Sequence, residues 1–222
     1  MHIVDGALSA PVLVAGAVAT VGGLAIGLRQ LDLEKIPAAG VLSATFFVAS
    51  LIHVPVGPSS VHLILSGLAG LALGWAAFPA LFVGLLLQAV FFGFGGVTVL
   101  GVNTVNIALP AVIVWYVCRR GVASGNPAVA AGWGAVGGAL AIALSAAMVG
   151  VSLALSGDAF VPAAWFAFAA NIPVMVVEAL IAGAAVFLAA RVKPELFGTV
   201  APAVPHTELA ASATPAARGA AK

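Results

Sequence analysis

Hydrophobic residues run along this chain in long unbroken stretches, without the regular polar interruptions of a soluble fold. No Asp, Glu, Lys or Arg occurs between Ile36 and Cys118, nor between Gly121 and Gly157. A bilayer core of about 30 Å needs about 20 apolar residues per helix, and continuous apolarity favours helices over barrel strands. The pattern therefore predicts seven transmembrane helices, at approximately residues 7–28, 36–53, 61–76, 78–95, 105–118, 128–155 and 164–190.

Proline and low-complexity signals mark the ends of these stretches. Pro37 stands at a span start, where its missing N–H costs little. Pro110 falls inside the fifth span and predicts either a kink or a shorter helix there. The end of the chain is rich in Ala, Pro and Thr with scattered charges, a composition typical of disorder. We expect a seven-span transmembrane domain over 1–198 and a disordered cytoplasmic tail over 199–222.

Composition confirms the membrane class. Of 222 residues, 63% are hydrophobic and 7% are charged, against about 25% charged in an ordinary soluble domain. A soluble enzyme, a nucleic-acid binder and a disordered chain are excluded, because a soluble fold of this size cannot bury so much apolar surface. The single cysteine, Cys118, excludes an internal disulfide and any zinc site of several thiolates.

Basic residues give the chain a direction in the membrane. With seven spans, all four clusters of Lys and Arg lie on one side, which the positive-inside rule makes cytoplasmic. The sequence thus predicts an all-α integral membrane protein with its amino terminus outside and its carboxyl terminus inside. The clusters are Arg29 with Lys35, Arg119 with Arg120, Arg191 with Lys193, and Arg218 with Lys222.

Histidines gather on the predicted outer side, where His2, His53 and His62 all fall. His53 and His62 flank a short loop, in which Ser59 and its neighbours predict a helix start with a serine cap. His62 would then lie in the first turn of the third span. The electropositive end of a helix favours a neutral imidazole, which is the form that a metal ion needs.

The opening dipeptide adds a specific chelating group. A free amine at Met1, the amide nitrogen of His2 and the His2 ring can form two fused chelate rings around one ion. A fourth nitrogen from His62 or His53 would complete a square-planar site, which points to Ni²⁺ or Cu²⁺, with Co²⁺ allowed by its chemistry. Asp5 either accepts a hydrogen bond from a ligand ring or caps the first span.

Glu178 is the one carboxylate in the middle of a predicted span. A charge at this depth is costly unless it is neutralised, paired or facing a polar cavity. We expect a protonated, hydrogen-bonded structural acid, with Gln88 in the fourth span as a candidate partner. A proton relay or an ion step through Glu178 is the alternative.

Three segments of the chain resemble the CbiM/NikM family, the substrate-binding membrane components of energy-coupling-factor transporters for cobalt or nickel. They are the opening MHIVDGALS, the stretch PVGPSSVHL that contains His62, and FGGVTVLGVNTVN that contains Asn103 and Asn106. The resemblance implies a seven-span protein in which Met1, His2 and His62 hold the ion. It also implies that Asn103 and Asn106 belong to a polar loop that closes the site. His53 is not part of the matched motif throughout the family, and we expect it and Asp5 only to lie near the site.

The resemblance also implies a mechanism and partners. The protein would capture Ni²⁺ or Co²⁺ outside the plasma membrane and deliver it inward, with no resident cofactor and no nucleic acid. It would act with a membrane coupling (T) subunit, a pair of cytoplasmic ATPases and a small additional membrane subunit. The chain itself carries no P-loop motif, so ATP hydrolysis must lie on separate subunits.

Other functions stay open at the level of sequence. One alternative is a component that binds an organic vitamin, which would need an aromatic pocket with hydrogen-bonding groups. Another is a secondary transporter or channel that works through Glu178, for which an internal repeat is expected. An enzyme is not expected, because no nucleophile elbow or zinc-protease motif is present. The choice between nickel and cobalt also stays open.

Overall fold

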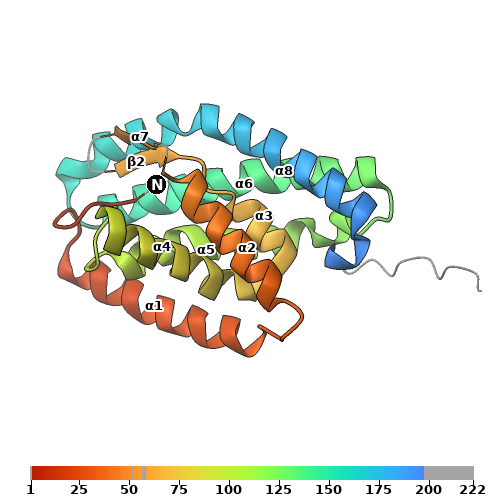
Figure 1. Ribbon diagram of the computed structural model, residues 1–222. Coiled ribbons are helices and arrows are strands. Elements are labelled where there is room, and N and C mark those ends of the chain that lie inside the picture. The colour runs from red at the N-terminus through yellow and green to blue at the C-terminus, as the bar shows by residue number, and fades with distance from the viewer. Residues whose placement is uncertain (1, 52, 57–58, 198–222) are drawn as a thin grey trace, which may run out of the picture.

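The protein is a bundle of apolar helices, seen here in a computed structural model that describes residues 2–51, 53–56 and 59–197 (Figure 1). Met1 and the predicted tail at 199–222 lie outside the described residues. The elements in chain order are α1 (Ala10–Arg29), α2 (Ile36–Ala49), β1 (His53–Val56), β2 (Ser59–His62), α3 (Ser66–Leu73), η1 (Gly74–Ala76), α4 (Ala77–Phe92), α5 (Leu100–Val122), α6 (Pro127–Ala154), η2 (Asp158–Phe160), α7 (Val161–Ala170), α8 (Ile172–Val192) and η3 (Pro194–Phe197).

Five helical runs in the described part of the chain are long and apolar enough to cross a membrane. They are Ala10–Arg29, Ser66–Phe92, Leu100–Val122, Pro127–Ala154 and Asp158–Val192, and the shorter helix Ile36–Ala49 is also apolar. The expectation of a helical, multi-pass membrane protein is therefore confirmed. The count of seven spans and the side on which each terminus lies stay predictions.

The third and fourth predicted spans differ most from expectation. Residues 61 and 62 belong to a strand, and the helix begins only at Ser66. Gly74 then interrupts the run between α3 and α4 with a left-handed backbone (φ +59°), which a side chain would strain. With eight residues, α3 is only about 12 Å long, too short to cross the hydrocarbon core alone. The end of the hairpin, at residues 61 and 62, replaces the first residues of the expected third span.

Close contacts between small residues hold the centre of the bundle together. The α6 helix packs most extensively against α8, and α5 packs against α6, α3, α1 and α4. A Cβ added to Gly134 in α6 would lie 2.8 Å from Cβ of Val186 in α8. Small residues allow helix backbones to approach closely where no hydrophobic effect drives association. Pro110 lies inside α5 as predicted. The alternative of a shorter helix is wrong, because α5 runs without a break from Leu100 to Val122.

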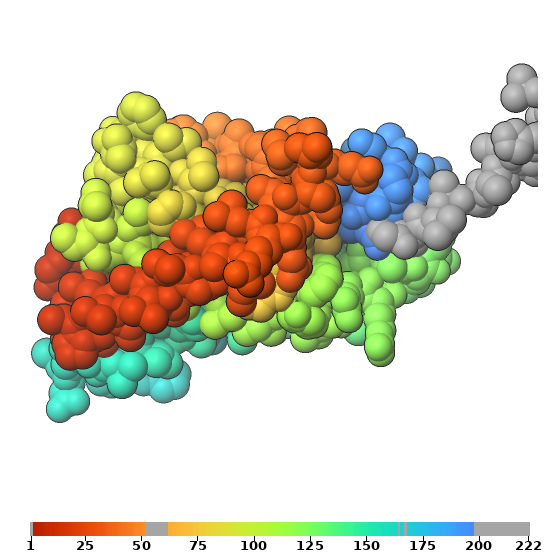
Figure 2. Space-filling model, turned by 90° about the horizontal axis from the view of Figure 1, so that it is seen from below, coloured from red at the N-terminus to blue at the C-terminus, as the bar shows by residue number. Residues whose placement is uncertain are grey.

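The α1 helix lies along one side of the bundle and leaves much of its surface uncovered (Figure 2). Val14 is 63% exposed, and Val18 and Val21 are each 67% exposed. In a multi-pass membrane protein, such an apolar face is in contact with lipid or with another membrane helix. The side of α1 that faces inward packs on α5, where a Cβ on Gly16 would overlap Val102.

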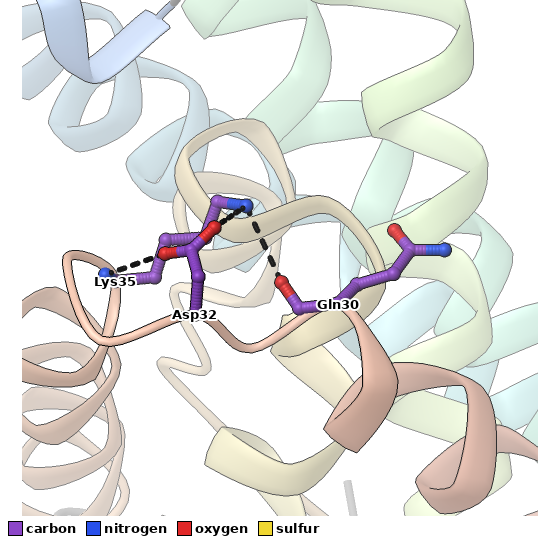
Figure 3. Close-up of polar contacts among 3 residues, drawn as sticks. All are labelled: Gln30, Asp32 and Lys35. Atoms are coloured by element: carbon purple, nitrogen blue, oxygen red, sulfur yellow. Dashed lines mark hydrogen bonds and ion pairs between the residues drawn. The ribbon is translucent and has the colours of Figure 1, made fainter.

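A small set of polar contacts closes the loop between α1 and α2 (Figure 3). The Lys35 ammonium lies 2.8 Å from Oδ2 of Asp32 and donates to the Gln30 carbonyl at 3.3 Å. The hydrogen bond from the Lys35 side chain lowers the pKa of Asp32 below its ordinary value. Both side chains are largely in solvent, so this pair orders the loop without adding much stability.

Candidate metal-binding site

The segment before α1, residues 2–9, begins inside the bundle. His2 is 3% exposed and Ile3 is fully buried. The side-chain amide of Asn103 holds Ile3 on both sides: Oδ1 accepts from the Ile3 N–H at 2.9 Å, and Nδ2 donates to the Ile3 carbonyl at 3.1 Å. This double hydrogen bond resembles one rung of a sheet, and it fixes the backbone immediately after His2.

The two asparagines of the third motif lie in a helix, and their expected place in a polar loop is wrong. Asn103 and Asn106 are in the first two turns of α5, which begins at Leu100. Only Asn103 reaches the N-terminal segment. The Asn106 side chain pairs with the Ser152 hydroxyl of α6 at 3.3 Å, so its contact belongs to the packing of α5 on α6.

His62 ends the second strand of an antiparallel hairpin, in which its Cα is paired with that of His53. The expected helix start at Ser59 is therefore wrong. The local sequence contains Pro55 and several valines, and β-branched residues favour extended backbone. The register places the two histidines side by side along the backbone, although the side chain of His53 lies outside the described part of the structure.

The hydrogen bond of the His62 ring determines where its lone pair lies. Nδ1 lies 2.8 Å from the Leu63 carbonyl oxygen, and a carbonyl can only accept. In the neutral ring, Nδ1 must therefore carry the hydrogen and Nε2 the lone pair. His62 is 3% exposed, so Nε2 is presented inside the protein.

The rings of His2 and His62, here called the His pair, are next to each other. Their centroids are 4.7 Å apart and their planes differ by 19°. Phe94, in the glycine-rich loop at residues 93–99, lies beside His2, with the ring centroids 6.3 Å apart. Segments from the start of the chain, the hairpin and the loop after α4 thus meet at one buried point.

Glycine lets this loop approach the site, a role that the sequence did not reveal. Gly95 has φ +77°, and a Cβ there would lie 2.6 Å from Nδ2 of Asn103 and 3.4 Å from Cβ of His2. Residues 93–96 form an irregular loop between α4 and α5. The sequence did not reveal that Gly95 and Phe94 lie beside His2, because a glycine run alone does not show which segment it approaches.

Asp5 fastens the N-terminal segment to the same loop. Its carboxylate accepts a hydrogen bond from the Thr98 hydroxyl. The alternative of a cap on the first span is wrong, because Ser9 occupies the cap position of α1 and no side chain caps that helix. The described contact of Asp5 is with Thr98, so its suggested bond to a ligand ring stays a prediction.

Glu178 makes hydrogen bonds with the backbone directly after His62. Oε1 accepts from the N–H of Leu65 at 2.8 Å and from the N–H of Ile64 at 2.5 Å. The expected hydrogen-bonded role agrees with this arrangement. The suggested pairing with Gln88 is wrong, because Gln88 donates to the Ser50 hydroxyl.

Within the residues that the structure describes, no group of three or more His, Cys, Asp or Glu side chains could surround an ion. The His pair offers two imidazoles, so a complete coordination shell needs donors of another kind. Main-chain nitrogen, such as the amide of His2, is a donor of this kind. The arrangement suits a site that is built partly from main-chain atoms.

Comparison with known proteins identifies the family. A family model for the cobalt uptake substrate-specific transmembrane region, CbiM, matches residues 2–196. A putative metal transport protein of Haemophilus influenzae is 43% identical over 206 residues, covering 88% of this chain and 96% of that protein. The fused nickel transport protein NikMN of Rhodobacter capsulatus is 34% identical over 237 residues, covering 94% of this chain and 67% of that protein.

A solved structure agrees with the sequence relatives. The crystal structure of a transition metal transporter is 28% identical and superimposes with a TM-score of 0.76, covering 86% of this chain and 93% of that one. Fold and relatives together define a multi-pass membrane protein of a metal transport class. Within that class the chain belongs to the CbiM family, and its resemblance to the CbiM/NikM substrate-binding components is confirmed.

Proposed function

We propose that this protein is the substrate-binding membrane component of an importer for Ni²⁺ or Co²⁺, and that the His pair is the core of its capture site. The observation that carries the proposal is the buried contact between the rings of His2 and His62, 4.7 Å apart. The relatives named as nickel and metal transport proteins favour a metal cargo over an organic vitamin.

The proposed ligands are the Met1 amine, the amide and ring nitrogens of His2, and Nε2 of His62. Two imidazole nitrogens in adjacent positions on one ion, each about 2 Å from it, bring the ring centroids to roughly 4.5 Å. The observed distance of 4.7 Å is close to that value, but the rings are stacked with 19° between their planes, so binding to one ion requires at least one ring to rotate. The tautomer of His62 also supports the proposal, because its Nδ1 contact with Leu63 leaves Nε2 as the donor.

This donor set favours Ni²⁺ over Co²⁺. Loss of the amide proton of His2 requires a strongly polarising late transition ion, and four nitrogens in a plane suit Ni²⁺ or Cu²⁺. The double hydrogen bond from Asn103 to Ile3 supports the site, since it holds the chain that follows the chelating amide. His53 and Asp5 are proposed to lie near the site without binding the ion.

The transport cycle that we propose is inward and driven by ATP on other chains. Capture occurs outside the plasma membrane, and seven spans place the amino terminus outside and the basic loops in the cytoplasm. A membrane coupling (T) subunit and a pair of ATPases then reorient the protein, together with a small additional membrane subunit. The family membership supports this cycle.

The most direct test changes only the start of the chain. Purified protein with an untouched Met1 amine should bind one Ni²⁺ tightly, and one alanine added before Met1 should abolish tight binding, because it removes the fused chelate rings. The matched control carries the same alanine after Lys222 and should bind like the unmodified protein. Tight binding by the amino-terminal extension would refute the proposed ligand set.

A further inference from the structure

One peptide group, which joins Leu63 to Ile64, is hydrogen-bonded at both ends to side chains from different elements. Its carbonyl oxygen lies 2.8 Å from Nδ1 of His62. Its N–H donates to Oε1 of Glu178 in α8. The carboxyl of Glu178 and the ring of His62 are therefore connected through a single planar amide.

We infer that Glu178 is a positioning residue for His62 and acts through this peptide group. A carboxyl oxygen that accepts from an amide N–H draws negative charge onto the carbonyl oxygen at the other end. That oxygen then holds the Nδ1 hydrogen of His62 more firmly, so the ring keeps its orientation and its lone pair stays on Nε2. Histidine ligands commonly donate their second N–H to a carboxylate for the same purpose; here one peptide group stands between the two.

The packing around Glu178 fixes the acceptor in place. Its side chain is fully buried, and a Cβ added to Gly138 of α6 would lie 2.6 Å from the Glu178 carbonyl oxygen. The α3 helix, which follows the Leu63–Ile64 peptide group, also packs closely on α6. A Cβ on Gly67 in α3 would lie 2.8 Å from the Gly137 carbonyl oxygen. Glu178 and the start of α3 therefore both pack against α6.

A simpler role for Glu178 must be separated from this one. Leu65 is the N-terminal boundary residue of α3, has a left-handed backbone (φ +55°), and receives no side-chain cap from its own segment. Glu178 accepts its N–H at 2.8 Å, so the carboxyl also caps α3 from a distance. If capping were its only role, removing the carboxyl would loosen α3 and leave the tautomer of His62 unchanged.

The tautomer can be measured without any metal. In full-length protein labelled with ¹⁵N-histidine in detergent, long-range ¹H–¹⁵N spectra report which nitrogen of His62 carries the hydrogen, and the His62→Ala variant assigns the signals. We expect the Nδ1–H form in the unmodified protein and a mixture of both tautomers in Glu178→Leu. An unchanged Nδ1–H form in Glu178→Leu would overturn the inference.

A milder variant decides the matter even if Glu178→Leu does not fold. Glu178→Gln keeps a carbonyl acceptor near the Ile64 N–H, but that acceptor is weaker. The inference predicts that the Nδ1 proton of His62 moves upfield in Glu178→Gln, as its hydrogen bond weakens, and stays in place in Gln88→Leu, a buried control in α4. An unmoved proton in Glu178→Gln would contradict the inference.

Nickel binding gives a second readout, which rests on the proposed function. Titration with Ni²⁺ alone should show roughly 10- to 100-fold weaker binding for Glu178→Leu, the range typical of lost support behind a metal ligand. The same change made in His62→Ala should weaken binding by less than about twofold, because the effect passes through His62. If Glu178→Leu lowers the affinity for Ni²⁺ equally with and without His62, the connection is refuted. If His62→Ala alone leaves the affinity unchanged while Glu178→Leu still alters the tautomer of His62, only the proposed ligand set is refuted.

Discussion

Two regions of this protein are held together in opposite ways. Around the His pair, irregular chain is fixed by a few directed polar contacts: Asn103 to Ile3, Asp5 to Thr98 and Glu178 to the backbone after His62. Between α6 and α8, the contacts are close approaches of glycines to the facing helix, at Gly134 and Gly138. A single substitution can therefore remove one polar contact at the site and leave the others in place. The association of α6 with α8, in contrast, depends on complementary shape along the whole length of both helices.

This difference predicts which substitutions affect binding and which affect folding. The largest effect on binding should come from His62→Ala. We expect the affinity for Ni²⁺ to fall by more than about 100-fold, since a ligand is removed and not merely a supporting group. Calorimetric or competition titration measures the loss, and His206→Ala in the tail should bind normally. Normal affinity in the His62→Ala variant would show that the hairpin supplies no ligand to the ion.

Asn103 and Asn106 offer a matched pair on one helix. Asn103→Leu should weaken Ni²⁺ binding by roughly 10- to 100-fold, because about 1–3 kcal/mol is at stake when the buried N–H and C=O of Ile3 lose their partners. Asn106→Leu removes only the contact with Ser152 and should change affinity by less than about threefold. Equal losses for both variants would show that the site depends on α5 as a whole.

Gly134 tests the other region. Gly134→Ala should lower the free energy of unfolding by roughly 1–3 kcal/mol, the usual cost of overpacking, because the new Cβ would lie 2.8 Å from Val186. The control is Gly132→Ala in the same helix, where an added Cβ meets nothing within 4 Å. Thermal unfolding in detergent measures stability. At temperatures where both variants are folded, both should bind Ni²⁺ normally. A large loss of affinity in Gly134→Ala would show that the metal site depends on the packing of α6 on α8.

The smallest effect is expected at the loop between α1 and α2. The pKa of Asp32 lies below its ordinary value because of Lys35, so any stabilisation is present above the ordinary carboxyl range and is lost as the pH falls through the lowered pKa. Asp32→Asn should remove this pH dependence and leave Ni²⁺ binding unchanged. Chemical shifts of the Lys35 side chain across an acid titration would report the contact, and a Lys35 signal insensitive to pH in the unmodified protein would contradict it.

The sequence predicts the helices well and the site in part, for physical reasons. Apolar runs without charge identify membrane helices from composition alone, since lipid tolerates few other structures. The hairpin was missed because Ser59 and Ser60 suit a helix cap as well as a strand, and the choice depends on packing far away, including the α8 carboxyl that holds Ile64 and Leu65.

Contacts between distant segments were beyond the reach of the sequence. Asn103 was singled out as a residue near the site, but its pairing with the backbone of Ile3 depends on how α5 lies against the start of the chain. The close approach of Gly95 to His2 and Asn103 likewise depends on a left-handed backbone that only the folded loop reveals. His2 and His62 were predicted together from ligand chemistry, and the structure brings their rings into contact.

The central claim is that the first two residues of the chain and His62 coordinate the same ion. Its most direct test is the absorption and magnetism of purified protein loaded with Ni²⁺, prepared with an unmodified Met1 amine. Four nitrogens in a plane predict a yellow, diamagnetic sample containing one Ni²⁺ per chain. A pale, paramagnetic sample, typical of Ni²⁺ in octahedral coordination, would contradict the claim.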